Sequence, residues 1–403
     1  MAGLAPFSSG MRPGLLRILN AVRKHMGMEV AFISEILDGR RFFRHVDAGD
    51  SGLDILPGGS DPVEDSYCIR VIDGRLPELI PDACVNVEAL TLPVTRALPV
   101  GAHLSIPIRL ADGEIYGTFC CFSRSPDETL TPRDLSVMRV FAEMAGDQIQ
   151  QDIDDRNAMH RVDDRIDGVL QSDGLRMVYQ PIVDVATKRV VGFESLARFM
   201  TEPYRTPDVW FLEAATAGRA VELETLAIRM ALGALALLPP NAYLTVNASP
   251  ELIIKGQLAE TLHGLPLDRV VVEVTEHQAI ERYEDIAEVM VPLQKQGLRI
   301  AIDDAGAGYA SFRHILNLHP EIVKLDISFT RSIDSDRSRR ALAAALCGFA
   351  SETGCSIVAE GVETEGELEA IKALGITRVQ GYHLGRPMSL ADARQLIAQD
   401  TPA

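Results

Sequence analysis

Two adjacent aspartates, Asp303 and Asp304, end a short apolar run in the stretch RIAIDDAGAGYASF, residues 299–312. At about 4 Å, two carboxylates repel each other by roughly 4 kcal/mol at an effective dielectric near 20. A solvated turn offsets this repulsion for an isolated pair, whereas a bound cation offsets it in a cleft. Other polar residues along the chain favour the cleft.

Eight short apolar runs between residues 171 and 380 each end on a polar side chain. These are Gln180, Glu194, Asn247, Glu273, Asp303 with Asp304, Lys324, Glu360 and Gln380. The runs alternate with helix-like stretches, which predicts parallel strands and a (β/α)8-type, TIM-like barrel. Since the carboxyl ends of parallel barrel strands share one mouth, we expect these side chains to meet there. A Rossmann sheet is disfavoured, because no Gly-x-Gly-x-x-Gly follows the first run.

The carboxylates of this set would not all stay ionised in a cleft without cations. These carboxylates belong to Glu194, Glu273, Asp303, Asp304 and Glu360, with Glu363 as a further candidate. Oxygen donors without Cys or His favour Mg²⁺ or Mn²⁺. Two such ions about 3.5–4 Å apart hold the attacking and leaving oxygens in phosphodiester hydrolysis. Lys324 would add a fixed positive charge near a nucleophilic water or a phosphate.

The order of the motifs resembles the EAL family of cyclic di-GMP phosphodiesterases over residues 171–398. The signature appears as Glu194-Ser195-Leu196, with Ser in place of Ala. The motifs are VVGFESLARF, TVNASP, VVEVTE, AIDDAGAGYASF, VKLDISF, VAEGVET and VQGYHLGRP. The resemblance implies a phosphodiesterase that opens cyclic di-GMP to linear pGpG with two Mg²⁺ or Mn²⁺ ions.

The resemblance also implies residue roles. One ion would be held by Glu194, Asn247, Glu273 and Asp303, and the second by Asp303, Asp304 and Glu360. Lys324 and Glu363 would orient or deprotonate the water, beside Glu360, and Glu276 would brace the loop after Asp304. The substrate would contact Gln180, Leu196, Arg198 and Gln380. From the residues alone, Asn247 is equally a turn cap, Arg198 a surface ion pair and Gln380 a partner for backbone groups.

The chain departs from the family pattern in the loop after the paired aspartates. Ala305 and Ala307 stand where the family usually has Phe and Thr. The predicted metal ligands are unchanged, but the loop has lost bulk and a hydroxyl. A second hypothesis therefore stands beside the hydrolase, namely a weak or inactive EAL domain that acts as a cyclic di-GMP receptor.

The first part of the chain, residues 1–131, predicts an α+β domain with an antiparallel sheet. Two strand pairs surround Asp38-Gly39 and Asp112-Gly113, which are hairpin signals. This layout resembles a GAF sensor domain. We expect a GAF ligand, which the sequence does not identify. Cys68 is a candidate redox or ligand contact.

A long helix is predicted over residues 132–170, before an EAL domain at residues 171–403. Its heptad seam is apolar at both ends and polar at its centre, at Asp152 and Asp155. The seam runs through Met138, Phe141, Ala145, Gln148, Asp152, Asp155, Met159, Val162, Ile166 and Val169. It predicts either a signalling helix in a homodimer or two helices, each packed on its own domain.

Composition limits the classes of partner. With 57 acidic and 39 basic residues, the formal net charge of -18 disfavours binding to polymeric nucleic acid. No apolar run reaches the length of a membrane span, and we see no signal peptide. The six scattered cysteines are typical of reduced thiols. We therefore expect a cytoplasmic protein.

Overall fold

The computed structural model describes residues 13–53, 55–274, 282–305 and 309–399 of the chain. Its internal contacts divide into two compact units, Met1–Ala158 and Met159–Ala403. The division falls within α4 (Pro132–Gln171), a single helix of 40 residues. The sequence had left open whether this segment forms one helix or two, and the structure has one. The expected domain boundaries at residues 131 and 170 remain a prediction.

The first unit contains a six-stranded antiparallel sheet in the order β3-β2-β1-β6-β5-β4. Both predicted hairpins are confirmed. Asp38 and Gly39 join β1 to β2 with φ angles of 49° and 73°, the left-handed conformation that a two-residue hairpin turn requires. The strands are β1 Val30–Leu37, β2 Arg40–Asp47, β3 Ser60–Pro62, β4 Leu79–Ile80, β5 Ala102–Arg109 and β6 Ile115–Ser123.

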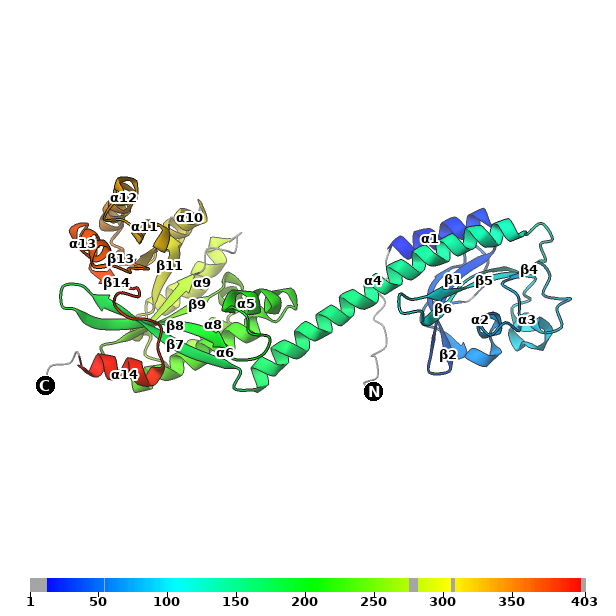
Figure 1. The fold of residues 1–403 in the computed structure, drawn as a ribbon, viewed down its shortest axis with the longest axis horizontal. Helices are drawn as coiled ribbons and strands as arrows, with labels where there is room; N and C mark the ends of the chain where they lie inside the picture. The colour runs from blue at the N-terminus through cyan, green and yellow to red at the C-terminus, as the bar shows by residue number, and fades with distance from the viewer. Residues whose placement is uncertain (1–12, 54, 275–281, 306–308, 400–403) are drawn as a thin grey trace. The chain divides into compact units, whose positions relative to one another are not determined.

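Helices cover both faces of this sheet (Figure 1). Strand alternation sends successive side chains of β6 to opposite faces. Cys121 and Phe119 join the core beneath α1 (Pro13–His25) and the first turns of α4. Cys120 and Phe122 join the core on the other face, beside α2 (Tyr67–Ile72). The unit also contains α3 (Pro93–Ala97) and the short helices η1 (Val63–Asp65) and η2 (Ala89–Thr91).

The second unit is a closed eight-stranded barrel, as the eight apolar runs predict. Its strands are β7 Leu175–Asp184, β8 Arg189–Phe199, β9 Tyr243–Ala248, β10 Val270–Val274, β11 Arg299–Ala305, β12 Ile322–Leu325, β13 Ser356–Ala359 and β14 Arg378–Val379. The predicted TIM-like barrel is therefore confirmed.

The expectation that all eight strands run parallel is wrong for one strand. β7 pairs antiparallel with both β8 and β14. Only a short turn separates β7 from β8, whereas a parallel crossover needs about a dozen residues or more. Gln180 and Glu194 consequently lie opposite each other within this hairpin, rather than at two parallel strand ends. They still reach the same level of the barrel.

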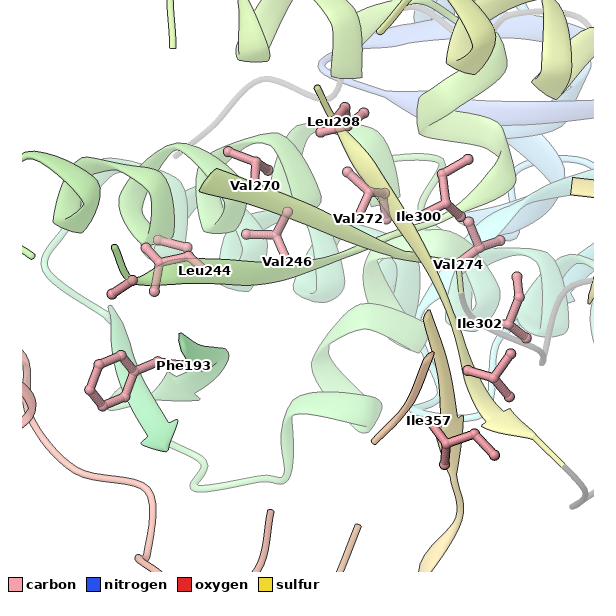
Figure 2. Close-up of a cluster of buried hydrophobic side chains, with 14 of the residues drawn as sticks. Phe193, Leu244, Val246, Val270, Val272, Val274, Leu298, Ile300, Ile302 and Ile357 are labelled. Atoms are coloured by element: carbon pink, nitrogen blue, oxygen red, sulfur yellow. The ribbon is translucent and has the colours of Figure 1, made fainter. Parts of the chain in front are cut away.

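Helices surround the barrel. The strand residues that point outward pack against them in a large apolar core, part of which Figure 2 shows with Val270, Val272 and Val274 of β10 beside Ile300 and Ile302 of β11. The helices are α5 Pro207–Thr216, α6 Ala220–Leu232, η3 Gly233–Leu237, α7 Pro250–Ile254, α8 Gln257–Leu262, η4 Leu267–Arg269, α9 Tyr283–Gln294, α10 Tyr309–Leu318, α11 Ile327–Thr330, α12 Arg337–Thr353, α13 Glu365–Ala373 and α14 Leu390–Gln399.

The apolar residues at the two ends of the predicted seam on α4 are buried in the cores of this chain. Met138 and Ala145 are fully buried in the core of the first unit. Ile166 and Val169 are fully buried in the second, among Leu175, Phe199 and Trp210. Each end of the seam therefore packs on its own domain, as the second alternative expects, although the two ends belong to one helix. Among the described helices, none is long and apolar enough to cross a membrane.

Candidate active site

The interior of the barrel is built in layers. One apolar layer comprises Ile182, Tyr243, Val271, Ala301, Ile322 and Val358, from six strands. Because strand side chains alternate, the residue two positions further along each parallel strand faces the same interior. That step leads from Val271 to Glu273, from Ala301 to Asp303, from Ile322 to Lys324 and from Val358 to Glu360. The predicted polar side chains therefore form the next layer toward the mouth.

Lys324 lies at the centre of this polar layer. Its side chain is 2% exposed, and its Nζ atom pairs with four carboxylates from four different strands or strand ends. The distances from Nζ are 2.7 Å to Glu360 Oε1, 2.9 Å to Glu273 Oε2, 3.0 Å to Asp303 Oδ1 and 3.3 Å to Glu194 Oε1. We call these five residues the Lys324 cluster.

The electrostatics of the cluster are dominated by burial. Burial alone lowers the pKa of Lys324, but Asp303, Glu194, Glu273 and Glu360 outweigh it and hold the pKa well above its usual value. Lys324 is therefore an ammonium. Burial also raises the pKa of Glu273 to about 8, with Lys324 opposing the rise and Glu194 and Asp303 adding to it. The pKa of Glu360 is raised well above its usual range for the same reasons.

The donor set of the cluster fits a hard cation. Four carboxylates surround one ammonium, so a cation would offset the surplus of negative charge in the cluster. The buried atoms Glu273 Oε1 and Gln380 Oε1 have no hydrogen-bond partner, and both are acceptors that a cation would satisfy. Oxygen donors of this kind suit Mg²⁺ or Mn²⁺. Among the described residues, no three His, Cys, Asp or Glu side chains already stand in metal-ligand positions.

Two glutamines close the cluster on the β7 side. Gln380 Nε2 donates to Gln180 Oε1 at 3.2 Å and to Glu194 Oε2. Gln180 Nε2 in turn donates to the Gly385 carbonyl at 3.3 Å. These bonds join β7, β8 and the chain after β14, and they fix one face of the Glu194 carboxylate.

A cavity of about 430 Å³ lies among β8, β9, α5 and α6, and its lining includes none of the five residues of the Lys324 cluster. Three predicted residues line it, namely Leu196 and Arg198 of β8 and Asn247 of β9. Of these, Asn247 is the neighbour of Glu273 in the pairing of β9 with β10. Arg198 Nη1 donates to the Ala197 carbonyl at 2.7 Å.

Sequence reasoning missed the helical wall of this cavity. Phe211 of α5 and Glu224 of α6 line it. Glu224 accepts a hydrogen bond from the Ser249 N–H at 3.0 Å, and burial raises its pKa. The sequence does contain a signal for Glu224, because this carboxylate lies near Leu223 and Ala227 on the apolar face of the helical segment LETLAI.

Three predicted residues lie elsewhere or outside the described residues. Glu363 pairs with Arg331 at 3.3 Å, and its backbone N–H donates to Glu367. Glu276 lies outside the described residues, as does the side chain of Asp304. Their predicted roles, and that of Glu363, stay predictions. Ala307 also lies outside the described residues, so the structure gives no account of the altered loop.

The position of Glu360 depends on the glycine that follows it. Gly361 has a φ angle of +64°, and a Cβ there would come within 2.3 Å of Ile327 Cγ1. Only glycine adopts this conformation without strain at such close packing. The backbone therefore turns sharply after Glu360, which leaves its carboxylate within reach of Lys324.

Comparison with known proteins identifies both parts of the chain. Residues 163–387 match the family model of the EAL domain, and they make up more than half of the chain. The chain belongs to the EAL family. Residues 14–149 match the model of the GAF domain. The resemblances seen in the motifs and in the N-terminal layout are thereby confirmed.

The relatives of this EAL protein are matched over part of their length. An uncharacterized protein of Azorhizobium caulinodans is 32% identical over 265 residues, which are 62% of this chain and 35% of the relative. A Pseudomonas aeruginosa protein named cyclic di-GMP phosphodiesterase is 30% identical over 233 residues, or 54% of this chain and 39% of the relative. The chain thus spans less than half the length of these relatives.

Solved structures agree with the barrel. The structure titled PaMucR phosphodiesterase, c-di-GMP complex, is 26% identical, with a TM-score of 0.52 over 58% of this chain and 99% of the other. The cAMP and cyclic di-GMP bound form of the EAL enzyme Bd1971 covers 92% of this chain and 93% of its own, with a TM-score of 0.57. At 16% identity, the second likeness concerns the fold alone.

Proposed function

We propose that the chain hydrolyses cyclic di-GMP to linear pGpG in a metal-dependent reaction. The observation that carries this proposal is the convergence of four carboxylates, two buried and two partly buried, on Lys324 at one level of the barrel. The substrate is proposed from the names of the Pseudomonas aeruginosa relative and of the PaMucR complex. Water would break one of the two phosphodiester bonds of the cyclic dinucleotide.

Two Mg²⁺ or Mn²⁺ ions are part of this proposal. Glu194, Asn247, Glu273 and Asp303 would hold one ion, and Asp303, Asp304 and Glu360 the other. When bound, such ions polarise the phosphate and activate the attacking water. The Lys324 ammonium already lies 2.7–3.3 Å from four of these carboxylates, so it would remain in the site as a compact, fixed charge.

The chain's own side chains would bind the rest of the reactants. The cavity lined by Leu196 and Arg198 would receive a nucleotide portion of the substrate, with Arg198 turning from the Ala197 carbonyl toward a phosphate. Gln180 and Gln380 would keep the Glu194 carboxylate oriented. Lys324 would orient the attacking water and Glu363 would take its proton, and Glu276 would brace the loop beyond Asp304.

A receptor that binds cyclic di-GMP without opening it is the second candidate. Two observations support this second candidate. Lys324 pairs with the same carboxylates that would hold metal, and Ala305 and Ala307 replace bulkier family residues. The two candidates differ in product. The hydrolase forms pGpG with Mg²⁺ or Mn²⁺, whereas the receptor retains cyclic di-GMP unchanged under the same conditions.

The test measures pGpG release by wild type and by Glu194→Ala, Asn247→Ala and Asp303→Asn. Each variant loses an expected metal ligand, so turnover should fall by roughly 100-fold or more. Asp326→Asn is the matched control. Asp326 follows β12 directly but caps α11 through the Ser328 N–H at 2.9 Å, a role that Asn also performs.

The control should retain wild-type turnover. Near wild-type pGpG production by any of the three ligand variants would contradict the proposed metal ligands. A wild type that binds cyclic di-GMP in Ca²⁺ and forms no pGpG with Mg²⁺ or Mn²⁺ would establish the receptor instead. We further propose that the GAF domain regulates this activity and that the protein acts as a homodimer.

A further inference from the structure

Two buried cysteines meet in the core of the GAF domain. Cys68 on α2 and Cys120 on β6 are both 0% exposed, and their sulfur atoms lie 3.8 Å apart. The neighbouring Cys121 points to the opposite face of the sheet, into a different core. Strand alternation thus selects Cys120 alone as the partner of Cys68.

A buried arginine contacts one sulfur of the pair. Arg41 is 4% exposed and its Nη1 atom donates to Cys68 Sγ at 3.4 Å. Its Nε atom donates to Asp61 Oδ1 at 2.9 Å, which holds the guanidinium in place. Burial alone raises the pKa of Cys68, but the hydrogen bond from Cys120 and the charge of Arg41 outweigh it and hold that pKa well below its usual value. Because the guanidinium of Arg41 contacts Cys68, we assign Cys68 as the attacking sulfur.

The second sulfur has the opposite environment. Cys120 Sγ lies 3.1 Å from both Thr118 Oγ1 and Ser105 Oγ. Burial, followed by the hydrogen bond and charge of Cys68, raises its pKa well above the usual value. Cys120 therefore stays a thiol that carries its proton. A thiolate beside a thiol is the arrangement in which an oxidised first sulfur is captured by the second.

A small cavity lies in the same core. Its volume is about 20 Å³, and its lining includes Arg41, Tyr67 and His103 but neither cysteine. Such a volume holds roughly one water-sized molecule. Arg41 lines this cavity and also contacts Cys68. Hydrogen peroxide, which is close to this size, is therefore the oxidant that we choose for the test.

We propose that Cys68 and Cys120 form a peroxide-sensitive disulfide in the GAF domain. The Cys68 thiolate attacks one oxygen of hydrogen peroxide, the O–O bond breaks, and the leaving hydroxide takes a proton to become water. The Cys120 thiol then attacks the Cys68 sulfenic acid, forming the S–S bond and releasing a second water. Two thiol sulfurs supply the two electrons that reduce the peroxide.

The disulfide would connect α2 to a central strand of the sheet. The sulfur atoms must approach from 3.8 Å to about 2.05 Å, so α2 or the side-chain rotamers shift. The bond is reversible by thiol reductants, as in redox-sensing proteins of reducing compartments. This proposal concerns the GAF domain alone and does not depend on the activity proposed for the barrel.

The experiment treats the full chain with hydrogen peroxide in a Cys84→Ser background, because Cys84 is an exposed, competing thiol. The intact mass should fall by two hydrogen atoms. Non-reducing peptide mapping should give a Cys68–Cys120 link, and a thiol reductant should restore both thiols. Cys121→Ser is the matched control, because it removes an adjacent buried thiol and should leave the link unchanged.

Two further variants test the order of events. In Cys120→Ser, a dimedone probe should label Cys68, whereas in Cys68→Ser it should not label Cys120. Arg41→Lys should slow labelling by roughly tenfold for each unit by which the pKa of Cys68 rises above the working pH. Wild-type maps that retain both thiols, or that link Cys121 instead, would overturn the proposal even if every variant failed to fold.

Discussion

The neighbours of two buried basic side chains hold Lys324 charged and His103 neutral. Lys324 is surrounded by carboxylates that keep it an ammonium. His103 is 3% exposed, its ring is tilted by 34° against that of Tyr67 with 4.5 Å between the centroids, and it lies near the guanidinium of Arg41. Burial, and then Arg41, lower the pKa of His103 to about 3. The imidazole is therefore neutral in the folded protein.

His103 should make the GAF domain sensitive to acid. Its folded pKa of about 3 lies below the ordinary value of 6.5, so between these values the unfolded chain binds a proton that the folded chain does not. The free energy of unfolding therefore falls as pH falls through this window, by about 2 kcal/mol at pH 5. Hydrogen exchange of amides in β5 and β6 measures this at pH 7.5 and pH 5.

The comparison is with His103→Phe, which keeps a ring against Tyr67 and cannot titrate. We expect the pH-dependent loss of stability to be smaller in the variant by about the same 2 kcal/mol. Equal losses in both proteins would mean that His103 already carries its proton in the fold, or is exposed to water.

At the scale of elements, the last turns of α4 belong to the packing of the barrel. Ile166 and Val169 lie beneath Trp210, and Arg165 pairs with Glu213 of α5 at 3.0 Å. Asp167 pairs with Arg219 at 2.6 Å. The same cluster includes Met177, Ala197 and Phe211 among its partly buried members, and all three also line the cavity of about 430 Å³. The end of α4 and the wall of the cavity thus share a core.

Ile166→Ala should therefore destabilise the barrel. Removing a fully buried Ile side chain costs about 2–5 kcal/mol. Trp210, the one tryptophan of the chain, lies in the same cluster, so its fluorescence during urea unfolding reports this unit. Met159→Ala is the control, because Met159 is 40% exposed on the same helix and should change stability by less than about 0.5 kcal/mol. Equal effects of the two variants would contradict the packing described for Ile166.

The elements could be predicted largely from local pattern. Alternation and the spacing of polar residues give the eight strands and the layer that holds Glu273 and Lys324. The reversed direction of β7 was also readable, because the gap before β8 is too short for a crossover. The contact between Cys68 and Cys120 was not, since 52 residues separate them and no periodicity reports which side chains meet across a core. The helical wall with Glu224 was missed because α6 reads as an ordinary buried helix.

At the scale of the whole molecule, the remaining question is association. The ends of the α4 seam pack within the chain, and between them lie Asp152, half-buried, and Asp155, exposed. If two copies pair along α4, these aspartates face their counterparts and repel. The homodimer, like the signalling role of the helix, stays a prediction that the central residues can test.

Asp152→Ile combined with Asp155→Leu should tighten the dimer. Each side chain that becomes buried adds about 1–3 kcal/mol, so the dissociation constant should fall at least roughly tenfold. Sedimentation of wild type and variant measures this. Asp154→Leu is the control, because Asp154 is an exposed neighbour off the seam. A monomeric wild type, or a control that associates as strongly as the seam variant, would show that α4 is not a dimer seam.

The antiparallel β7 has a consequence for how the protein is made. It closes the barrel by pairing with β14, whose residues are 378 and 379. A chain still on the ribosome and shorter than this already carries Glu194, Glu273, Asp303, Lys324 and Glu360, yet it lacks the strand that encloses them and Gln380, which holds Glu194. Burial of these charges, with its desolvation cost, is deferred until synthesis of the domain is nearly complete. A prematurely terminated chain therefore leaves its charges in water.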